Sequence, residues 1–305
     1  MLSVFDQSEF LERNRKDRKM SINEYHCRSI LTRATGYLRE VCSHSLNPYI
    51  GCGFGLSACG EGCYVRFNQW LTRGRVWGSF VDIKTNASEV YLETAEAERR
   101  WARNKGCVFS IFMSSSTDPW QPVEKKYRVT RAVLDAMISS PPDELILQTH
   151  TANIFDDAER IKTLSGFCSL RVHVSIEGDV ERLPGLPPPP CSLEQRIGVI
   201  GQLAGKGLTV VACLSPLYPM KDPDTFFKRL ADAGAAATVI DHFIFGDGSG
   251  NGSRTLKTAL PEAMARVLPG SVDLAYREAI ARTAVKYLPV GISCKGFAGI
   301  YSRTL

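Results

Sequence analysis

The sequence predicts an α/β fold built on a parallel sheet that is buried on both of its faces. Short β-rich runs alternate along the chain with helical segments in which apolar residues recur at three- and four-residue spacing. The β-rich runs lack a strict alternation of apolar and polar residues, which is typical of strands buried on both faces. These observations favour a full or partial β/α barrel or a doubly wound sheet, in which ligands bind beyond the carboxyl ends of the strands.

The expected elements follow one another from residue 107 onward. The predicted strands are residues 107–113, 144–150, 170–177, 208–216 and 237–245, and the predicted helices are residues 123–139, 192–207 and 222–234. The proline-rich tract 183–191 predicts a rigid connector before a helix for which Ser192 is a suitable N-cap. A flexible glycine-rich loop is expected after Gly246.

The chain divides into three predicted parts. Residues 1–40 are interpreted as an N-terminal extension or arm, because the segment LERNRKDRKM is highly charged and no clear strand is evident before the approach to Asn47. Residues 41–250 form the predicted core domain, and residues 251–305 a helical C-terminal extension.

Composition restricts the class of protein. The 305 residues are 44% hydrophobic and 23% charged, which is typical of a folded chain and argues against disorder. The net charge of +5 permits nucleic acid as a partner without indicating it. Because no run of about 18 apolar residues and no signal-peptide pattern occurs, we expect a cytoplasmic protein that is not in the membrane. We then expect some of the ten cysteines to be reduced, buried thiols and others to hold a metal.

Three cysteines on one glycine-rich stretch carry the strongest chemical signal. Cys52, Cys59 and Cys63 lie among glycines that would allow the loop to curl until the three sulfurs converge. Thiolates are soft ligands that suit both iron-sulfur clusters and zinc. A structural zinc would need a fourth ligand, for which His26 or Cys294 is available. Three thiolates on a cluster would instead leave one metal position open for another ligand.

Several blocks around these cysteines resemble one enzyme superfamily. NPYIGC (47–52) and CYVR (63–66) resemble the cluster loop of radical S-adenosylmethionine (SAM) enzymes of the spore photoproduct lyase-like, or DNA repair photolyase-like, group. Residues 116–137 resemble the group's second-strand segment and residues 192–219 its helix and fifth strand, so the resemblance extends in order over residues 45–245. The chain departs from the group in its wider spacing, C-x6-C-x3-C, and in Gly62, where the group often has an aromatic residue.

The resemblance implies a partial (β/α)6 TIM-like barrel on which the three cysteines hold a 4Fe-4S cluster. It further implies that SAM chelates the fourth iron, and that an external flavodoxin- or ferredoxin-like electron donor drives its cleavage to a 5'-deoxyadenosyl radical, which abstracts hydrogen from the substrate. That substrate is unidentified: a nucleic-acid lesion, a small metabolite, a peptide or RNA. The alternative from a different class is a zinc- or cluster-stabilised nucleic-acid-binding protein without SAM chemistry.

Residues near the predicted strand ends are the candidates for the rest of the site. The resemblance implies cofactor contacts from Tyr64, Ser114, Ser115, Ser116, Thr117, His150, Ser175, Glu177 and Arg196. Substrate contacts are predicted for Asp118, Trp120 and Gln121, and Cys294 is the candidate for a catalytic thiol. The structural alternatives are a serine-rich turn at 114–117, a capping role for Asp118, a strand-end His150, and a place in the core for Trp120 and Cys294 or at the surface for Arg196.

Overall fold

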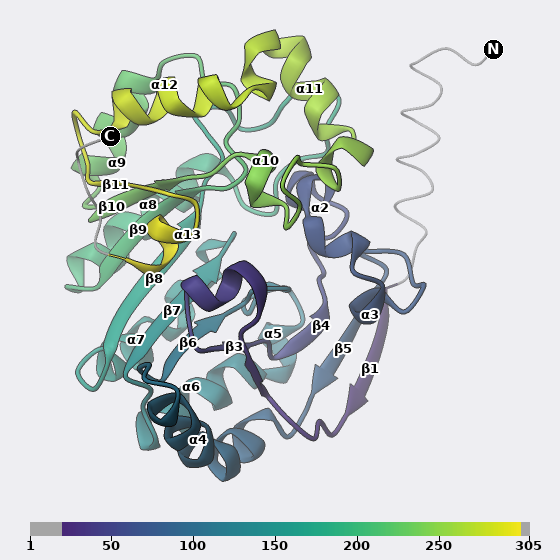
Figure 1. Cartoon of the computed structure of the whole chain (residues 1–305), viewed down its shortest axis with the longest axis vertical. Helices are drawn as coiled ribbons and strands as arrows, with labels where there is room; N and C mark the ends of the chain where they lie inside the picture. Colours follow the sequence, from purple (N-terminus) through teal and green to yellow (C-terminus); the bar gives the residue numbers. More distant parts are fainter. Residues whose placement is uncertain (1–19, 300–305) are drawn as a thin grey trace.

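The computed structural model describes residues 20–299, and its centre is an eight-stranded sheet with the order β11-β10-β9-β8-β7-β6-β3-β2 (Figure 1). Neighbouring strands run parallel from β3 to β11, and β2 is antiparallel to β3. The bounds are β2 Leu31–Arg33, β3 His44–Leu46, β6 Ser110–Met113, β7 Glu144–Thr149, β8 Ser169–Ser175, β9 Thr209–Leu214, β10 Ala237–Ile240 and β11 Val290–Ile292. The predicted α/β class is confirmed, and the strands β3 and β6 to β10 with their helices form the partial (β/α)6 barrel.

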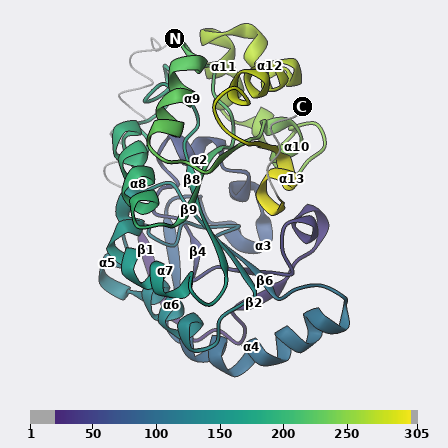
Figure 2. The same ribbon diagram turned by 90° about the vertical axis from the view of Figure 1, so that its left-hand side faces the viewer.

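Helices connect these strands and cover the outer face of the sheet. Figure 2 shows α5 to α9 along one side of it, whereas α10 and α13 lie on the other side. The longer helices are α4 Ala87–Asn104, α6 Val129–Ser139, α7 Ala158–Leu164, α8 Leu193–Gly205, α9 Pro223–Asp232, α11 Leu260–Val267 and α12 Leu274–Ala284. The shorter ones are α2 Ala58–Gly62, α3 Gln69–Thr72, α5 Glu124–Tyr127, α10 Phe243–Gly246 and α13 Ser293–Ala298. Short 3-10 turns span Gly36–Glu40, Tyr64–Phe67, Ala152–Asp157, Thr255–Lys257 and Pro269–Val272.

A second, three-stranded sheet stands beside the barrel in Figure 1 and carries the cysteine loop. It has the order β1-β5-β4, with β1 at Ser21–Tyr25, β5 at Phe80–Lys84 and β4 at Tyr49–Gly51. The expectation of no strand before Asn47 was therefore wrong, because β1 and β2 both precede it and pair within the two sheets. Residues 1–19 of the predicted N-terminal arm lie outside the described residues.

Three predicted elements differ from the structure by more than a few end residues. The predicted helix 123–139 is two helices, because Arg128 is in the left-handed region at φ 53°. The buried Glu124 carboxylate accepts hydrogen bonds from the backbone N–H groups of Thr130 and Arg131, so it caps the second helix, α6. The strand predicted to reach residue 245 ends at Ile240, and the C-terminal segment supplies the strand β11 as well as helices.

The core lies between the sheet and its outer helices. Alternate residues of the strands, such as Leu145, Leu147, Val172 and Val174, are fully buried there. Ser192 forms the predicted N-cap of α8, in a capping box with Gln195. Within residues 20–299, no helix combines the length and apolar character needed to cross a bilayer. The division at residues 40 and 250 stays a prediction.

Candidate functional site

A cavity of about 520 Å³ lies at the carboxyl ends of the barrel strands. Its wall includes the residues that directly follow the strands, among them Ser114 after β6, His150 after β7, Ser215 after β9 and Asp241 after β10. The cysteine loop, residues 52–63, follows β4 and includes α2, and it forms another part of the wall. Residues of α13 form a third part. Ligands of parallel β/α folds bind at this end of the strands, so the cavity is the candidate site.

The cysteine loop brings all three predicted ligands to the cavity. Cys52 follows β4, Cys59 lies within α2, and Cys63 directly follows α2. The loop folds tightly on itself, because a Cβ at Gly60 would lie only 2.1 Å from the backbone oxygen of Gly55. The side-chain oxygen of Gln121 accepts a hydrogen bond of 2.6 Å from the backbone N–H of Gly53. The glycines thus allow the loop to fold back on itself, and the convergence of the three sulfurs on one centre stays a prediction.

Burial raises the pKa of each of these thiols. For Cys59, the proximity of Cys63 and Cys52 raises the pKa further. For Cys63, burial raises the pKa to about 11 although the charge of Arg66 lowers it. Thiolates at these positions would repel one another, so a bound cation would stabilise their ionised form.

The chemistry of the donor set fits an iron-sulfur cluster. Three thiols on one loop are soft ligands, as iron-sulfur clusters require. Among residues 20–299, no three His, Cys, Asp or Glu side chains are grouped to hold a single metal ion. His26 is exposed, and the thiol of Cys294 lies 2.9 Å from the Glu40 carboxylate.

The segment after β6 is fixed by residues on both sides of the three cysteines. Asn47 donates its side-chain N–H to the Ser115 hydroxyl at 3.1 Å and accepts from the backbone N–H of Ser116 at 2.9 Å. The Thr117 hydroxyl donates to the backbone oxygen of Gly51 at 2.6 Å. The hydroxyl of Tyr64 donates to the backbone oxygen of Ser115 at 2.6 Å. These contacts join the loop to the barrel.

Ser114 differs from its neighbours because its buried hydroxyl oxygen has no hydrogen-bond partner among the described residues. Its backbone is in the left-handed region at φ 86°, which is uncommon for a residue other than glycine. The side chain lines the cavity. A buried polar atom without a partner is costly, so this hydroxyl is available to a bound polar group.

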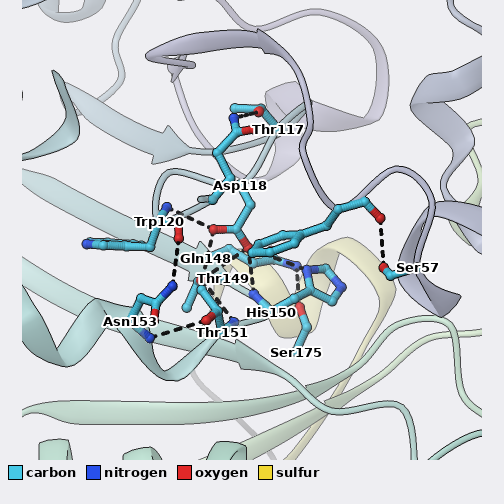
Figure 3. A network of polar contacts seen from close by, with 12 residues as sticks. Ser57, Thr117, Asp118, Trp120, Gln148, Thr149, His150, Thr151, Asn153 and Ser175 are labelled. Atoms are coloured by element: carbon cyan, nitrogen blue, oxygen red, sulfur yellow. Dashed lines mark hydrogen bonds and ion pairs between the residues drawn. The ribbon is translucent and has the colours of Figure 1, made fainter. Parts of the chain in front are cut away.

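Asp118 organises the ends of β6 and β7 (Figure 3). Its carboxylate accepts hydrogen bonds from the backbone N–H groups of Trp120 and His150 and, at 3.0 Å, from the Thr149 hydroxyl. Burial raises the pKa of Asp118, although the nearby His150 and these hydrogen bonds lower it. Asp118 therefore fixes the backbone, as the capping alternative predicts, while it also lines the cavity.

His150 lies between two carboxylates at the cavity wall. Its Nδ1 is 3.9 Å from Asp118 Oδ2, and its Nε2 is 3.7 Å from Glu177 Oε1. Burial lowers the pKa of His150, although the charges of Glu177 and Asp118 raise it. Burial alone would raise the pKa of Glu177, but Arg196 and His150 lower it, and this carboxylate is ionised near neutral pH.

Four of the predicted residues do not line the cavity: Trp120, Gln121, Ser175 and Arg196. Trp120 is buried and donates its indole N–H to Asp157 at 3.0 Å, as the core alternative predicts, and Gln121 holds the cysteine loop. Arg196 is 1% exposed, so the surface alternative is wrong. It donates to Glu177 at 2.6 Å and to the backbone oxygen of Ser175. The remaining candidates line the cavity: Cys52, Cys59, Cys63, Tyr64, Ser114, Ser115, Ser116, Thr117, Asp118, His150, Glu177 and Cys294.

Sequence reasoning missed the residue that follows β10. Asp241 is buried at the cavity wall, beside Phe243 and Phe245 of the next turn. The strand was predicted to continue to residue 245, which concealed it. The available signal was its place directly after the apolar run ATVI, because Ser114 and His150 follow their strands in the same way.

Comparison with solved structures identifies a similar fold. A mutant of spore photoproduct lyase with bound AdoMet and dinucleoside spore photoproduct matches with a TM-score of 0.59, over 89% of this chain and 81% of that chain. The fold resembles spore photoproduct lyase. A second mutant of that lyase, with dinucleoside spore photoproduct, has a TM-score of 0.53 and covers 72% of this chain and 60% of that one. Both are 11% identical in sequence to this chain, so the likeness to the lyase concerns the fold.

The sequence relatives carry no described activity. An uncharacterised protein of Methanocaldococcus jannaschii is 30% identical over 178 residues, which cover 57% of this chain and 60% of that protein. The chain thus spans less than two thirds of this relative's length. An uncharacterised protein of Mycobacterium tuberculosis strain H37Rv is 24% identical over 296 residues, 89% of this chain and 82% of that protein. No protein-family model matches the sequence.

Proposed function

We propose that this protein is a radical SAM enzyme in which Cys52, Cys59 and Cys63 hold a 4Fe-4S cluster. The observation that carries the proposal is that three cysteines from one loop line one cavity at the carboxyl ends of a partial barrel. The fold likeness to spore photoproduct lyase supports it. When bound, the cluster and SAM would supply a 5'-deoxyadenosyl radical, which abstracts hydrogen from the substrate. Within the cavity, the protein's own residues bind the cofactor and the substrate, orient them, and exclude water.

The residues around the cysteines divide into binding and positioning roles. The unpartnered hydroxyl of Ser114 is placed to contact a polar group of the cofactor, and so are His150 and Glu177. Arg196 acts through Glu177, whose carboxylate it holds in its ionised form. The other members of the predicted cofactor set support these groups: Tyr64, Ser115, Ser116, Thr117 and Ser175.

The substrate enters the same cavity, and its class belongs to the proposal. Since the similar lyase structures contain a dinucleoside spore photoproduct, a nucleic-acid lesion is one candidate, beside a small metabolite, peptide or RNA. Cys294 lines the cavity and is the candidate for a thiol that reacts with the substrate. An external flavodoxin- or ferredoxin-like protein would supply electrons in the cytoplasm. The alternative of a structural metal in a nucleic-acid-binding protein is not favoured by the fold likeness.

Iron content and cofactor cleavage test the proposal together. Protein purified without oxygen should be brown, hold about four irons per chain, and release 5'-deoxyadenosine from SAM once it is reduced. Single Cys52→Ala, Cys59→Ala and Cys63→Ala variants should lose the cluster and the cleavage, because each removes one thiolate. Cys168→Ala is the matched control, since Cys168 follows α7 and does not line the cavity. A colourless protein with one zinc and no cleavage would refute the proposal, and equal loss in all four variants would indicate misfolding instead.

A further inference from the structure

Asp241 is a buried carboxylate at the cavity wall that the proposed function does not use. It is 6% exposed and directly follows β10. Its Oδ1 accepts hydrogen bonds from the backbone N–H of His242 at 3.0 Å and from the hydroxyl of Ser293 at 3.1 Å. Its Oδ2 accepts no hydrogen bond from the rest of residues 20–299. The carboxylate is thus fixed through one oxygen and leaves the other for a ligand.

The chain leaves space for this free oxygen at Gly246. A Cβ built at Gly246 would lie 2.8 Å from Oδ2 of Asp241 and 3.1 Å from Oδ1. Both residues line the cavity. Since a side chain at Gly246 would displace the carboxylate, the lack of one keeps Asp241 accessible from the cavity.

Phe245 adds an aromatic face next to this carboxylate in the chain. It is 62% exposed although it lines the cavity, and its backbone is in the left-handed region at φ 67°. For a bulky residue this conformation is strained, and such strain is concentrated at active sites, ligand clamps and switch regions. The neighbouring ring of Phe243 is held against His242, with ring centroids 4.3 Å apart. This part of the cavity wall therefore combines aromatic faces with the free acceptor oxygen of Asp241.

The charged groups around Asp241 leave it as an acceptor at neutral pH. Burial raises its pKa to about 6, although the Ser293 hydrogen bond and the charge of Arg277 lower it. Arg277 also lines the cavity, but its guanidinium is bonded to Glu278. Asp241 thus has no direct ion pair among the described residues.

We propose that Asp241, Phe245 and Gly246 form a subsite for a planar ring that carries an N–H donor, the chemistry of a nucleobase. The free oxygen of Asp241 accepts the ring N–H, and Phe245 stacks on the ring face. The inference rests on the proposed function, which places the cofactor and the substrate in this cavity. Such a ring has two sources there, the adenine of SAM and a base of the substrate.

The decisive variant is Asp241→Asn. The donors of His242 and Ser293 would hold the amide oxygen in the place of Oδ1, so the amide N–H₂ would take the place of Oδ2. A donor would then face the donor of the ring, and binding should weaken at least about tenfold. Asp232→Asn is the matched control, because its carboxylate is exposed and paired with Lys228 on the surface of α9.

Calorimetric titration of the purified full chain measures the affinity for each ligand without turnover. One arm titrates S-adenosylhomocysteine, and the other titrates thymidine, deoxycytidine, deoxyadenosine and deoxyguanosine in the presence of saturating S-adenosylhomocysteine. A loss in the first arm assigns the subsite to adenine, and a loss only in the second assigns it to the substrate. Phe245→Ala should weaken binding of the same ligand, whereas Phe167→Ala, at a similarly exposed ring of 60%, should not.

Two results would overturn the subsite. These are equal affinities of wild type and Asp241→Asn for every ligand, and the absence of measurable binding of any of them to the wild type. The outcome is separate from the test of the proposed function. A chain that holds no iron but loses base binding in Asp241→Asn would refute the radical SAM assignment and retain the subsite.

Discussion

At the scale of single residues, two aspartates of the same cavity wall should contribute to stability in opposite directions as the pH rises. Burial raises the pKa of Asp241 to about 6. Burial also acts to raise the pKa of Asp247, but hydrogen bonds from Ser249 and Thr255 outweigh it and lower the value. A raised carboxyl pKa means that the folded protein binds the proton more tightly than the unfolded chain does, so the ionised group destabilises the fold above pH 6.

Asp241→Asn should therefore raise the free energy of unfolding at pH 8, and the gain should disappear near pH 4. A shift of about two pKa units corresponds to about 3 kcal/mol, which is the upper limit of the gain. Asp247→Asn should lower the free energy of unfolding at pH 8, since its ionised form is the stabilised one. Urea unfolding at both pH values measures these differences. A loss of stability in Asp241→Asn at pH 8 would contradict the argument.

Residue positions were predictable where the position along a strand determines them. Ser114, Asp118, His150 and Glu177 line the cavity, as expected of residues that follow parallel strands. Trp120 was placed at the same mouth, but its indole points to Asp157 in the core. Sequence order does not give the direction of a side chain in a turn, because that direction depends on partners far along the chain.

At the scale of elements, the cysteine loop depends on close backbone contact at Gly60. A methyl group there would meet the backbone oxygen of Gly55 at 2.1 Å, and backbone cannot move aside as a flexible side chain can. Gly60→Ala should displace Cys59, lower the iron content and decrease stability. Gly198→Ala is the control, since Gly198 lies in α8 with no atom within 4 Å of the new Cβ and should stabilise by about 0.5–1 kcal/mol. Full iron content in Gly60→Ala would contradict this picture of the loop.

Element types were easier to predict than element ends. The strands β6 to β10 each coincide with a predicted run, apart from the first residue of β8, because buried apolar residues identify them. The break between α5 and α6 was not foreseen, since it depends on the carboxylate of Glu124, which caps α6 from the preceding turn and also accepts a hydrogen bond from Tyr49. The apolar pattern continues across that break and gives no sign of it.

At the scale of the whole molecule, the order of the inner barrel strands was predictable and the strands at the sheet edges were not. The order of strands and helices follows from the alternation along the sequence, which allows few topologies. The pairing of β1 with β5 and of β10 with β11 joins segments far apart in the sequence. The sequences of β1 and β11 have no pattern that distinguishes a strand from a loop. Only tertiary packing therefore defines these two sheet edges.

The C-terminal segment should form one cooperative unit with the barrel, through Phe297. The Phe297 ring on α13 packs inside the barrel against Phe112 of β6 and His173 of β8, with centroid distances of 6.2 and 5.7 Å. Arg171 of β8 also donates to the backbone oxygens of Ala298 and Gly299. Because the ring is half-buried, Phe297→Ala should cost about 2–3 kcal/mol, less than a fully buried ring.

The midpoint of urea unfolding measures the loss of stability in Phe297→Ala. Phe297 also lines the cavity wall. Phe167→Ala, at an exposed ring, should change stability by no more than about 0.5 kcal/mol. Unfolding of Phe297→Ala should stay a single transition. A variant that keeps the wild-type midpoint, or that unfolds in two steps, would mean that residues 293–298 dock on the barrel without stabilising it, and α13 would then be a separable wall of the cavity.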